Sequence, residues 1–305
     1  MIVKKYNQIN GYFLLDKPYG ISSSQAVQKI RKIFNVQKIG HTGSLDPLAT
    51  GMLPICIGKA TKFSQYLMKS NKTYQVIAKL GEKTNTADSF GKIIKTRSIN
   101  FNLKKYKKVI KKFLGQTFQI PPMYSAIKHN GKPLYKYAYK GISIKRKKRL
   151  IKIFKIKIIK IQKKFLNLII KCSSGTYIRT IIEDIGEKLN CGAHVIFLRR
   201  LKILNLSYKN LITIKQLLFL KFQDKFLNTN NLFKKIILPI NKLYIFLPTL
   251  KISSKIYNIL KIKDIVKLND NINFGNGFFK IFLKKNKKYL GIGKINKNNR
   301  LFFIK

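Results

Sequence analysis

Acidic side chains are rare in this sequence, and one of them lies in an unusual loop. The chain has only 10 aspartate and glutamate residues among its 305. Asp46 follows His41-Thr42-Gly43, precedes Pro47, and lies between Gly40 and Gly51. Glycines let the backbone approach a ligand closely, and such a loop can hold one carboxylate in a fixed pose. Asp46 is therefore a candidate catalytic carboxylate, although an Asp-Pro pair more commonly just begins a turn.

The other acidic residues are weaker candidates for chemistry. One group lies on a predicted helix, where exposed charges are expected: Glu183, Asp184 and Glu187. A second group has lysine-rich surroundings, where surface ion pairs contribute little stability: Asp224, Asp264 and Asp270. Asp46 stands apart from both groups because of its glycine-bracketed loop.

The sequence lacks the signatures of several common chemistries. Its 3 histidines, His41, His129 and His194, are scattered, with no H-x-H, H-E-x-x-H or mixed Cys/His cluster. We therefore predict no metal site. It has no G-x-x-x-x-G-K-[ST] loop, no G-x-G-x-x-G after a strand and no G-x-S-x-G. Nucleotide hydrolysis and dinucleotide redox chemistry thus lack their phosphate cradles, and we expect a reaction without a cofactor.

The charge balance points to a polyanionic partner. The chain has 64 Lys+Arg against 10 Asp+Glu, a formal net charge of +54. A charge of that size repels itself unless it binds an opposite charge, which favours nucleic acid over the alternative of an anionic membrane surface. The sequence is also crowded with Lys, Ile and Asn, which an AT-rich genome favours, so part of the excess can be mutational drift.

We expect a cytoplasmic protein. The apolar stretch at residues 12–15 is too short for a signal-peptide core, and no segment reaches the ~20 apolar residues of a membrane helix. Cys56, Cys172 and Cys191 are odd in number and show no C-x-x-C spacing. They are typical of free thiols in a reducing compartment.

Hydrophobic spacing predicts the elements that must position these residues. Ser22 with Gln25 fits a capping box, and apolar residues then repeat at helical spacing as far as Phe34. Alternation predicts strands over 73–80 and 166–172. Amphipathic patterns predict helices over 103–114 and, after Gly175-Thr176, over 178–189.

Two segments have a different composition. Residues 121–149 are rich in Pro, Gly, Tyr and Lys, so they could stack on bases and neutralise phosphates, or could simply be a solvated loop. After Leu247-Pro248, short strand-like runs at 278–283, 289–295 and 301–304 alternate with Lys/Asn turns. This pattern predicts a small all-β module.

The segment Gly40–Pro54, GHTGSLDPLATGMLP, resembles the signature of the TruB family of bacterial-type tRNA pseudouridine synthases. Further segments agree with the family in order and spacing over about residues 10–200: Asp16-Lys17-Pro18 with Gly20, Lys72-Thr73-Tyr74, Pro121–Ala126 with His129–Lys132, Gly175–Thr180, Cys191–His194 and Leu198-Arg199-Arg200. The C-terminal module fits the family's PUA-like domain by position more than by sequence.

The resemblance implies catalytic roles for three residues. Asp46 would attack the target uridine and free the base from C1′, so that it can rotate and rejoin through C5; attack on the sugar and attack on the base ring both stay open. Arg179 would pair with Asp46 and keep it ionised, although helical spacing equally allows an i,i+4 surface pair with Glu183. Tyr74 would stack on the flipped base and help to remove the C5 proton; otherwise it is a core residue of its strand.

Further roles concern substrate binding. The resemblance places Tyr177 and Leu198 in the uracil pocket, where the alternative for both is plain packing. His41 would fill the space that the extruded nucleotide leaves, since a base inside a folded loop must flip out before a side chain can reach it. Lys17 would also bind the substrate. The chain departs from the family pattern at Tyr139, Lys145 and Asn85, which puts particular RNA contacts in doubt.

The resemblance thus implies an α+β protein with two domains. Residues 1–247 would form the pseudouridine synthase fold, a mixed, largely antiparallel sheet with flanking helices and an RNA-gripping insertion at 121–149. Residues 248–305 would form a PUA-like β-barrel. We expect a monomer that isomerises uridine 55 in the T stem-loop of tRNA without metal or membrane. The alternatives are a non-catalytic tRNA-binding or folding factor and a guide-RNA-dependent synthase of the archaeal and eukaryotic branch.

Overall fold

The computed structural model describes residues 6–204, 206, 208–227, 236–243, 247–268 and 275–304. Asp270, predicted as a surface acid, lies outside these residues. The chain divides into two compact units, Met1–Ile236 and Ile237–Lys305. The predicted domain boundary between 247 and 248 falls inside the second unit. No described helix is both long enough and apolar enough to cross a membrane.

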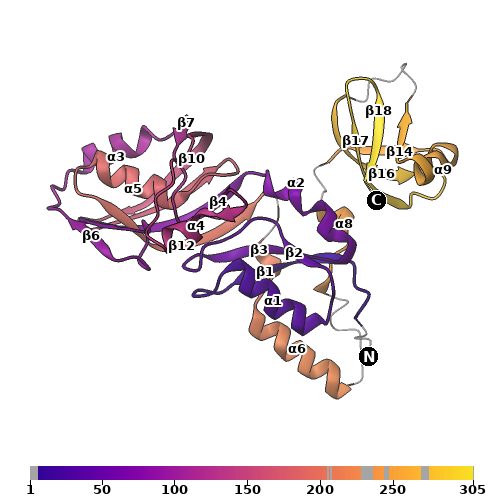
Figure 1. Ribbon diagram of the computed structural model, residues 1–305, viewed down its shortest axis with the longest axis horizontal. Helices are drawn as coiled ribbons and strands as arrows, with labels where there is room; N and C mark the ends of the chain where they lie inside the picture. The colour runs from indigo at the N-terminus through magenta and orange to yellow at the C-terminus, as the bar shows by residue number, and fades with distance from the viewer. Residues whose placement is uncertain are drawn as a thin grey trace. The chain divides into compact units, whose positions relative to one another are not determined.

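A nine-stranded sheet forms the body of the first unit, in the order β13-β1-β3-β12-β4-β11-β10-β7 with β2 added beside β3 (Figure 1). Its strands are β1 Gly11–Lys17, β2 Ile39–His41, β3 Thr50–Ile57, β4 Lys72–Leu80, β7 Gly115–Gln119, β10 Arg149–Ile161, β11 Phe165–Cys172, β12 Ala193–Ile203 and β13 Leu211–Ile212. Among the described strand pairs of this sheet, β1/β13 and β3/β12 are parallel and the others antiparallel. The predicted mixed, largely antiparallel sheet is therefore confirmed.

Helices flank this sheet as the sequence predicted. They are α1 Ser23–Phe34, η1 Gly58–Phe63, α2 Ser64–Met68, α3 Leu103–Lys111, α4 Leu134–Ala138, α5 Ile178–Lys188, η2 Tyr208–Asn210 and α6 Ile214–Leu227. Figure 1 shows α1 and α6 together next to β1 and β3, and α3 beside α5. The capping box is confirmed, because the Ser22 side chain accepts from the Gln25 amide and the Gln25 side chain accepts from the Ser22 amide. Short hairpins complete the unit: β5 Glu82–Thr84 with β6 Ile93–Thr96, and β8 Lys128–His129 with β9 Lys132–Pro133.

The two faces of the sheet differ in burial. Along β4, Tyr74, Val76 and Ala78 point to one face and are buried, together with the β11 and β12 residues paired with them. Helix α5 packs its buried isoleucines against this inner face. The residues between them, such as Thr73 and Gln75, are half-exposed and form the outer face. This is the alternation expected of a sheet packed on one side only.

The second unit is a five-stranded sheet of order β14-β16-β17-β18-β15 with its own apolar core. Its elements are α8 Ile240–Leu243, β14 Thr249–Ile252, α9 Ser254–Lys263, β15 Ile265–Lys267, β16 Gly277–Leu283, β17 Tyr289–Ile295 and β18 Arg300–Ile304. The three predicted strand runs are present, and the sheet fits a PUA-like module. The all-β prediction missed α9, which Ser253 caps and whose Leu260 is buried in the core.

Gly186 lets α5 sit directly on the start of β12. A Cβ at this position would lie 2.3 Å from the Ala193 nitrogen and 2.4 Å from the Gly192 carbonyl carbon, and both are backbone atoms that cannot rotate away. The Gly186 carbonyl also accepts hydrogen bonds from the amides of Cys191 and Gly192. Because α5 carries Arg179 and β12 carries Leu198, this contact fixes the spacing of two predicted site residues.

We predict that Gly186→Ala lowers the free energy of unfolding by at least about 1 kcal/mol, because overpacking against backbone outweighs the better helix propensity of alanine. Denaturant unfolding followed by circular dichroism measures it. Gly40→Ala is the matched control, since its added methyl meets nothing closer than 3.9 Å. Equal stability of Gly186→Ala and the wild type would show that the helix can shift without cost.

Candidate active site

The loop between β2 and β3 is tightly anchored. Ser23, at the start of α1, donates its hydroxyl to the Leu45 carbonyl at 3.1 Å and accepts the Leu45 amide at 2.8 Å. Leu45 and Leu48 are buried on either side of Asp46. The Ala49 amide donates to the Asp46 carbonyl at 3.0 Å, so the Asp-Pro pair does begin a turn. The Asp46 side chain, 36% exposed, is held at the surface of this fixed loop.

Arg179 meets Asp46 from the first turn of α5. Its Nη2 donates to Asp46 Oδ1 at 3.1 Å, and its Nε lies 2.8 Å from Oδ2, an ion-pair contact outside hydrogen-bond geometry. The guanidinium is buried and also donates to the carbonyls of Thr86 and Tyr124, at 2.8 and 2.7 Å. Glu183 pairs instead with Lys83 at 3.0 Å, so the alternative helical pair for Arg179 is wrong.

A second carboxylate, not among the predicted site residues, faces the same guanidinium. Asp88 Oδ2 lies 3.5 Å from Arg179 Nη1, and the Asp88 side chain is buried. Its Oδ1 accepts from the Thr86 hydroxyl at 2.7 Å and from the Phe90 amide at 3.0 Å. Asp88 and Asp46 thus hold Arg179 from two sides. The one sequence signal was its position just after Thr84-Asn85-Thr86, a segment already noted for Asn85.

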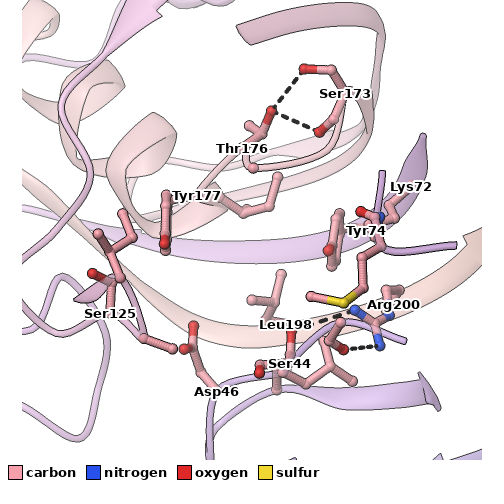
Figure 2. A pocket seen from close by; sticks show the side chains of 18 residues that line it. Ser44, Asp46, Lys72, Tyr74, Ser125, Ser173, Thr176, Tyr177, Leu198 and Arg200 are labelled. Carbon is pink, nitrogen blue, oxygen red and sulfur yellow. Dashed lines mark hydrogen bonds between the residues drawn. The ribbon is translucent and has the colours of Figure 1, made fainter. Parts of the chain in front are cut away.

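A cavity of about 340 Å³ opens beside Asp46 and has the size of a small-ligand site. Its lining includes four predicted site residues, Asp46, Tyr74, Tyr177 and Leu198. Figure 2 shows the rings of Tyr74 and Tyr177 on two sides of the cavity, with Leu198 and Asp46 below them. Arg179 contacts Asp46 from outside this lining. The structure therefore brings together five of the residues that the resemblance named, from four separate parts of the chain.

The two tyrosines have different polar neighbours. Burial raises the pKa of Tyr74, while the charge of Arg200 and a hydrogen bond from it lower that pKa in part. Burial also raises the pKa of Tyr177, and a hydrogen bond with Ser125 opposes the rise. Gln119, at the end of β7, fixes the Tyr177 backbone by accepting its amide at 2.8 Å and donating to its carbonyl at 3.0 Å.

Arg200, which the sequence analysis quoted in a motif but gave no role, lines the cavity floor. It is 1% exposed and donates from Nε to the Met52 carbonyl at 2.7 Å and from Nη2 to the Gly43 carbonyl at 3.0 Å. It therefore ties β12 to the start of β3 and to the Asp46 loop. Figure 2 shows Arg200 in the lining, near Tyr74 and Lys72. An alternating strand alone predicts an apolar core position here, not a buried arginine that donates to backbone carbonyls and to Tyr74.

Lys17 lies outside the cavity lining, and its contact with the substrate stays a prediction. Its side chain is fully buried at the end of β1, where Nζ donates to the carbonyls of Pro18 at 2.8 Å and Ile21 at 2.6 Å. A third, longer contact reaches the Pro47 carbonyl at 3.4 Å. Burial lowers the pKa of Lys17 to about 8, with Asp46 opposing the shift and Arg200 adding to it. The structure thus gives Lys17 a place beneath the Asp46 loop.

Lys72 and His41 complete the surroundings of the loop. Lys72 lines the cavity, and Nζ donates to the carbonyls of Ser70 at 2.6 Å and Met68 at 2.9 Å; burial lowers its pKa to about 8. His41 ends β2 outside the lining, and its Nδ1 accepts the Gly43 amide at 3.3 Å. Burial, and then the charge of Arg200, lower the pKa of His41, which favours the neutral ring.

Among the described residues, no group of three or more His, Cys, Asp or Glu side chains could hold a metal ion. Cys56, Cys172 and Cys191 are buried free thiols. Burial raises the pKa of Cys56 to about 12 and of Cys172 to about 11, which keeps both in the unreactive thiol form. The chemistry available at the site is that of one exposed carboxylate, two tyrosines and buried cations.

Comparison with known proteins identifies the family. The model of the TruB family pseudouridylate synthase N-terminal domain matches residues 31–178, and that of the tRNA pseudouridylate synthase B C-terminal domain matches residues 179–244. The tRNA pseudouridine synthase B of Buchnera aphidicola subsp. Acyrthosiphon pisum is 48% identical over 97% of this chain and 95% of its own length. The enzyme of that name from Photorhabdus laumondii is 43% identical over 96% and 94%. The chain belongs to the TruB family of pseudouridine synthases.

Solved structures agree with this assignment. A chain from the crystal structure of a Cbf5-Nop10-Gar1 complex superposes with a TM-score of 0.72 at 26% identity, covering 97% of this chain and 84% of that one. The pseudouridine synthase fold predicted from the sequence is confirmed.

The burial of Lys17 generates a pH prediction. Its pKa is about 8 in the folded chain against an ordinary 10.5, so between these values the unfolded chain binds more protons and stability rises with pH. We predict that the unfolding free energy of the wild type, measured relative to Lys17→Met, rises from pH 8 to pH 10 by at most about 1.4 kcal/mol per pH unit. Denaturant titrations at each pH test it, with Lys104→Met as the exposed-lysine control. A difference in unfolding free energy between the two proteins that does not change with pH would contradict the prediction.

Proposed function

We propose that this protein converts uridine 55 in the T loop of tRNA to pseudouridine, with Asp46 as the nucleophile. The observation that carries the proposal is the contact of Arg179 with both oxygens of Asp46 at a cavity lined by Tyr74, Tyr177 and Leu198. Relatives that cover nearly the whole chain carry the name tRNA pseudouridine synthase B, which supports tRNA as the substrate. The net charge of +54 suits a polyanionic substrate.

The reaction needs no partner beyond the RNA. The target uridine leaves its stack and enters the cavity, paying the unstacking energy through contacts made there. Asp46 attacks, either at C1′ or on the base ring, and the bond from C1′ to N1 breaks. The base rotates and forms a bond from C5 to C1′, and the bond between the Asp46 carboxylate and the substrate breaks, which regenerates the free carboxylate. C5 then loses its proton and N1 gains one. Atoms and electrons balance without metal, redox carrier or phosphoryl donor, so we propose a reaction without a cofactor.

Arg179 is proposed to orient the nucleophile. A planar guanidinium that contacts both carboxylate oxygens fixes the direction of the carboxylate as well as stabilising its charge. The buried Asp88 and the carbonyls of Thr86 and Tyr124 hold the guanidinium in turn. Such support limits the freedom of Asp46 before the substrate arrives, which is the condition for efficient attack.

Tyr74 is proposed to stack on the flipped base and to take part in removing the C5 proton. The nearby Arg200 supplies positive charge and a hydrogen bond that favour a phenolate-like oxygen during that step. Tyr177 and Leu198 would line the uracil pocket from the opposite side. His41 would occupy the gap left in the RNA loop, where a neutral, flat ring stacks well. For Lys17 the buried position favours support of the loop over contact with the substrate.

The insertion at 121–149 is proposed to grip the RNA. Tyr124 contributes its carbonyl to Arg179, and Ser125, Ala126 and Ile127 line the cavity, so the insertion is part of the site itself. We propose that the enzyme acts alone in the cytoplasm, as a monomer. The non-catalytic alternative does not account for the paired carboxylate and tyrosines. Relatives at 43–48% identity favour the stand-alone enzyme over the guide-RNA branch.

We predict that Asp46→Asn lowers turnover at uridine 55 by at least about 1000-fold, because the amide cannot act as the nucleophile. The purified full-length chain is incubated with a T-arm transcript without cofactor, and modification is mapped by nucleotide position. Binding of the transcript should stay within about twofold. Asp184→Asn, on α5, is the matched control. Product from the mutant at the wild-type rate, or none from the wild type, would defeat the proposal.

We predict that Arg179→Lys lowers kcat by at least about 10-fold, since an ammonium cannot contact both Asp46 oxygens while keeping the Asp88 contact. Single-turnover kinetics on the same transcript measure the step. Glu183→Gln is the control that separates the two partners considered for Arg179, and it should keep the wild-type rate. If Glu183→Gln were as slow as Arg179→Lys, the ion pair with Asp46 would not be the cause.

A further inference from the structure

The outer face of the large sheet is open over β4, β11, β10 and β7. The residues of this outer face are identified from the strand register, because two residues directly opposite each other on paired strands point to the same face of the sheet. Lys79 lies opposite Phe165, Lys171 opposite Lys155, and Phe118 opposite Leu150. The side chains of this face on these strands are half-exposed or exposed, whereas those of the inner face that pair across β4 and β11 are buried.

Large apolar side chains gather at one end of this face. Phe118 is 67% exposed and its partner Leu150 is 58% exposed. Phe154, at a bulge of β10, is 40% exposed, and the Lys152 ammonium lies 5.4 Å from the centre of its ring. Large apolar side chains exposed on one face of a sheet are costly in water and mark a binding surface. A cation already over a ring shows that charged and aromatic groups share the same patch.

Lysines continue the patch along β10 and β11. Lys155 and Lys171 lie directly opposite each other, and such like-charge pairs destabilise a sheet. Lys157 and Lys160 extend the row along β10, both exposed. In the part of the chain that the structure describes, none of these lysines forms an ion pair with a carboxylate. An anion bound across the row would relieve this repulsion.

From these two observations we infer that the outer face binds an unpaired RNA strand. Flat rings on an open sheet stack on bases of any sequence, and flanking lysines neutralise the phosphates. A duplex does not suit the patch, because its bases are stacked inside. A protein surface would need a matching row of acidic groups. The fully cationic row therefore favours RNA.

The strand on the outer face must differ from the segment in the cavity. Tyr74 and Leu198 reach the cavity from the inner face, so the sheet separates the two sites. A short stem-loop with its loop in the cavity cannot lie on both faces at once. The inference therefore stands independently of the chemistry at Asp46. Lysine is abundant throughout this chain, so the decisive feature is the combination with exposed phenylalanines.

The test uses the full chain and a fluorescein-labelled oligoadenylate of about 12 nucleotides, a length that one stacking surface can hold. It has no uridine and so is not a substrate. Fluorescence anisotropy should show at least about 10-fold weaker binding for Phe118→Ser combined with Phe154→Ser. Lys155→Gln with Lys157→Gln and Lys160→Gln should weaken binding and reduce the slope of log affinity against log salt by about 2. Turnover of a T-arm hairpin should stay unchanged in both variants.

Matched controls separate this surface from general charge. Phe219→Ser removes a phenylalanine that is 60% exposed on α6, and glutamines at Lys104, Lys107 and Lys108 remove the same charge from α3. Neither should weaken binding by more than about twofold. Equal losses from the control and outer-face variants would overturn the inference, as would displacement of the oligoadenylate by unlabelled T-arm hairpin. Unchanged binding in both outer-face variants would also overturn it and leave a protein as the occupant.

Discussion

The guanidinium of Arg179 joins four segments that are far apart in the sequence. It contacts Asp46 in the β2–β3 loop, Asp88 and Thr86 after β5, and Tyr124 in the insertion, while its own backbone begins α5. A buried cation is stable only when its charge and its donors are satisfied, so each of these partners must be in place for α5 to pack. The position of the exposed carboxylate is thereby coupled to the packing of the sheet and its helices.

Three further buried cations lie near the same loop. Lys17, Lys72 and Arg200 direct their donors at backbone carbonyls of the surrounding turns. The charge of Arg200 lowers the pKa of both lysines, so the three cations repel one another. Fixed positive charge beside a cavity is costly in the free protein but favourable once negative charge develops there, and preorganised charge of this kind is a common source of catalysis.

Periodicity explains which parts of the fold could be predicted. The strand β4 and the helix α1 could be predicted because apolar residues recur with a period of 2 in a strand and 3.6 in a helix. This spacing is visible in the local sequence. Helix α9 was missed because its neighbours suggested only short strands and its apolar pattern is weak. The nine-stranded order could not be predicted, since it depends on pairings such as β1 with β13 between distant segments.

The residues of the candidate site also fall into those that local sequence could predict and those that it could not. Asp46 stood out because glycines bracket it, yet its partner could not be chosen from spacing: Arg179 is four residues from Glu183 and far from Asp46 in the chain. Asp88 and Arg200 look locally like an acid in a turn and a residue of a strand. Their roles arise only from tertiary proximity. For Lys17, the motif position marks the residue without saying whether it contacts the substrate or holds the loop.

The excess of lysine admits two explanations, and position on the sheet separates them. Mutational drift adds lysine wherever a side chain can reach water, so it accounts for cations scattered over helices such as α3. It does not account for Lys155 lying opposite Lys171, where repulsion opposes pairing, or for Phe118 and Leu150 exposed further along the same face. Drift toward lysine also cannot by itself keep apolar side chains in water. The outer face therefore has the features of a binding surface, distinct from the cavity on the inner face.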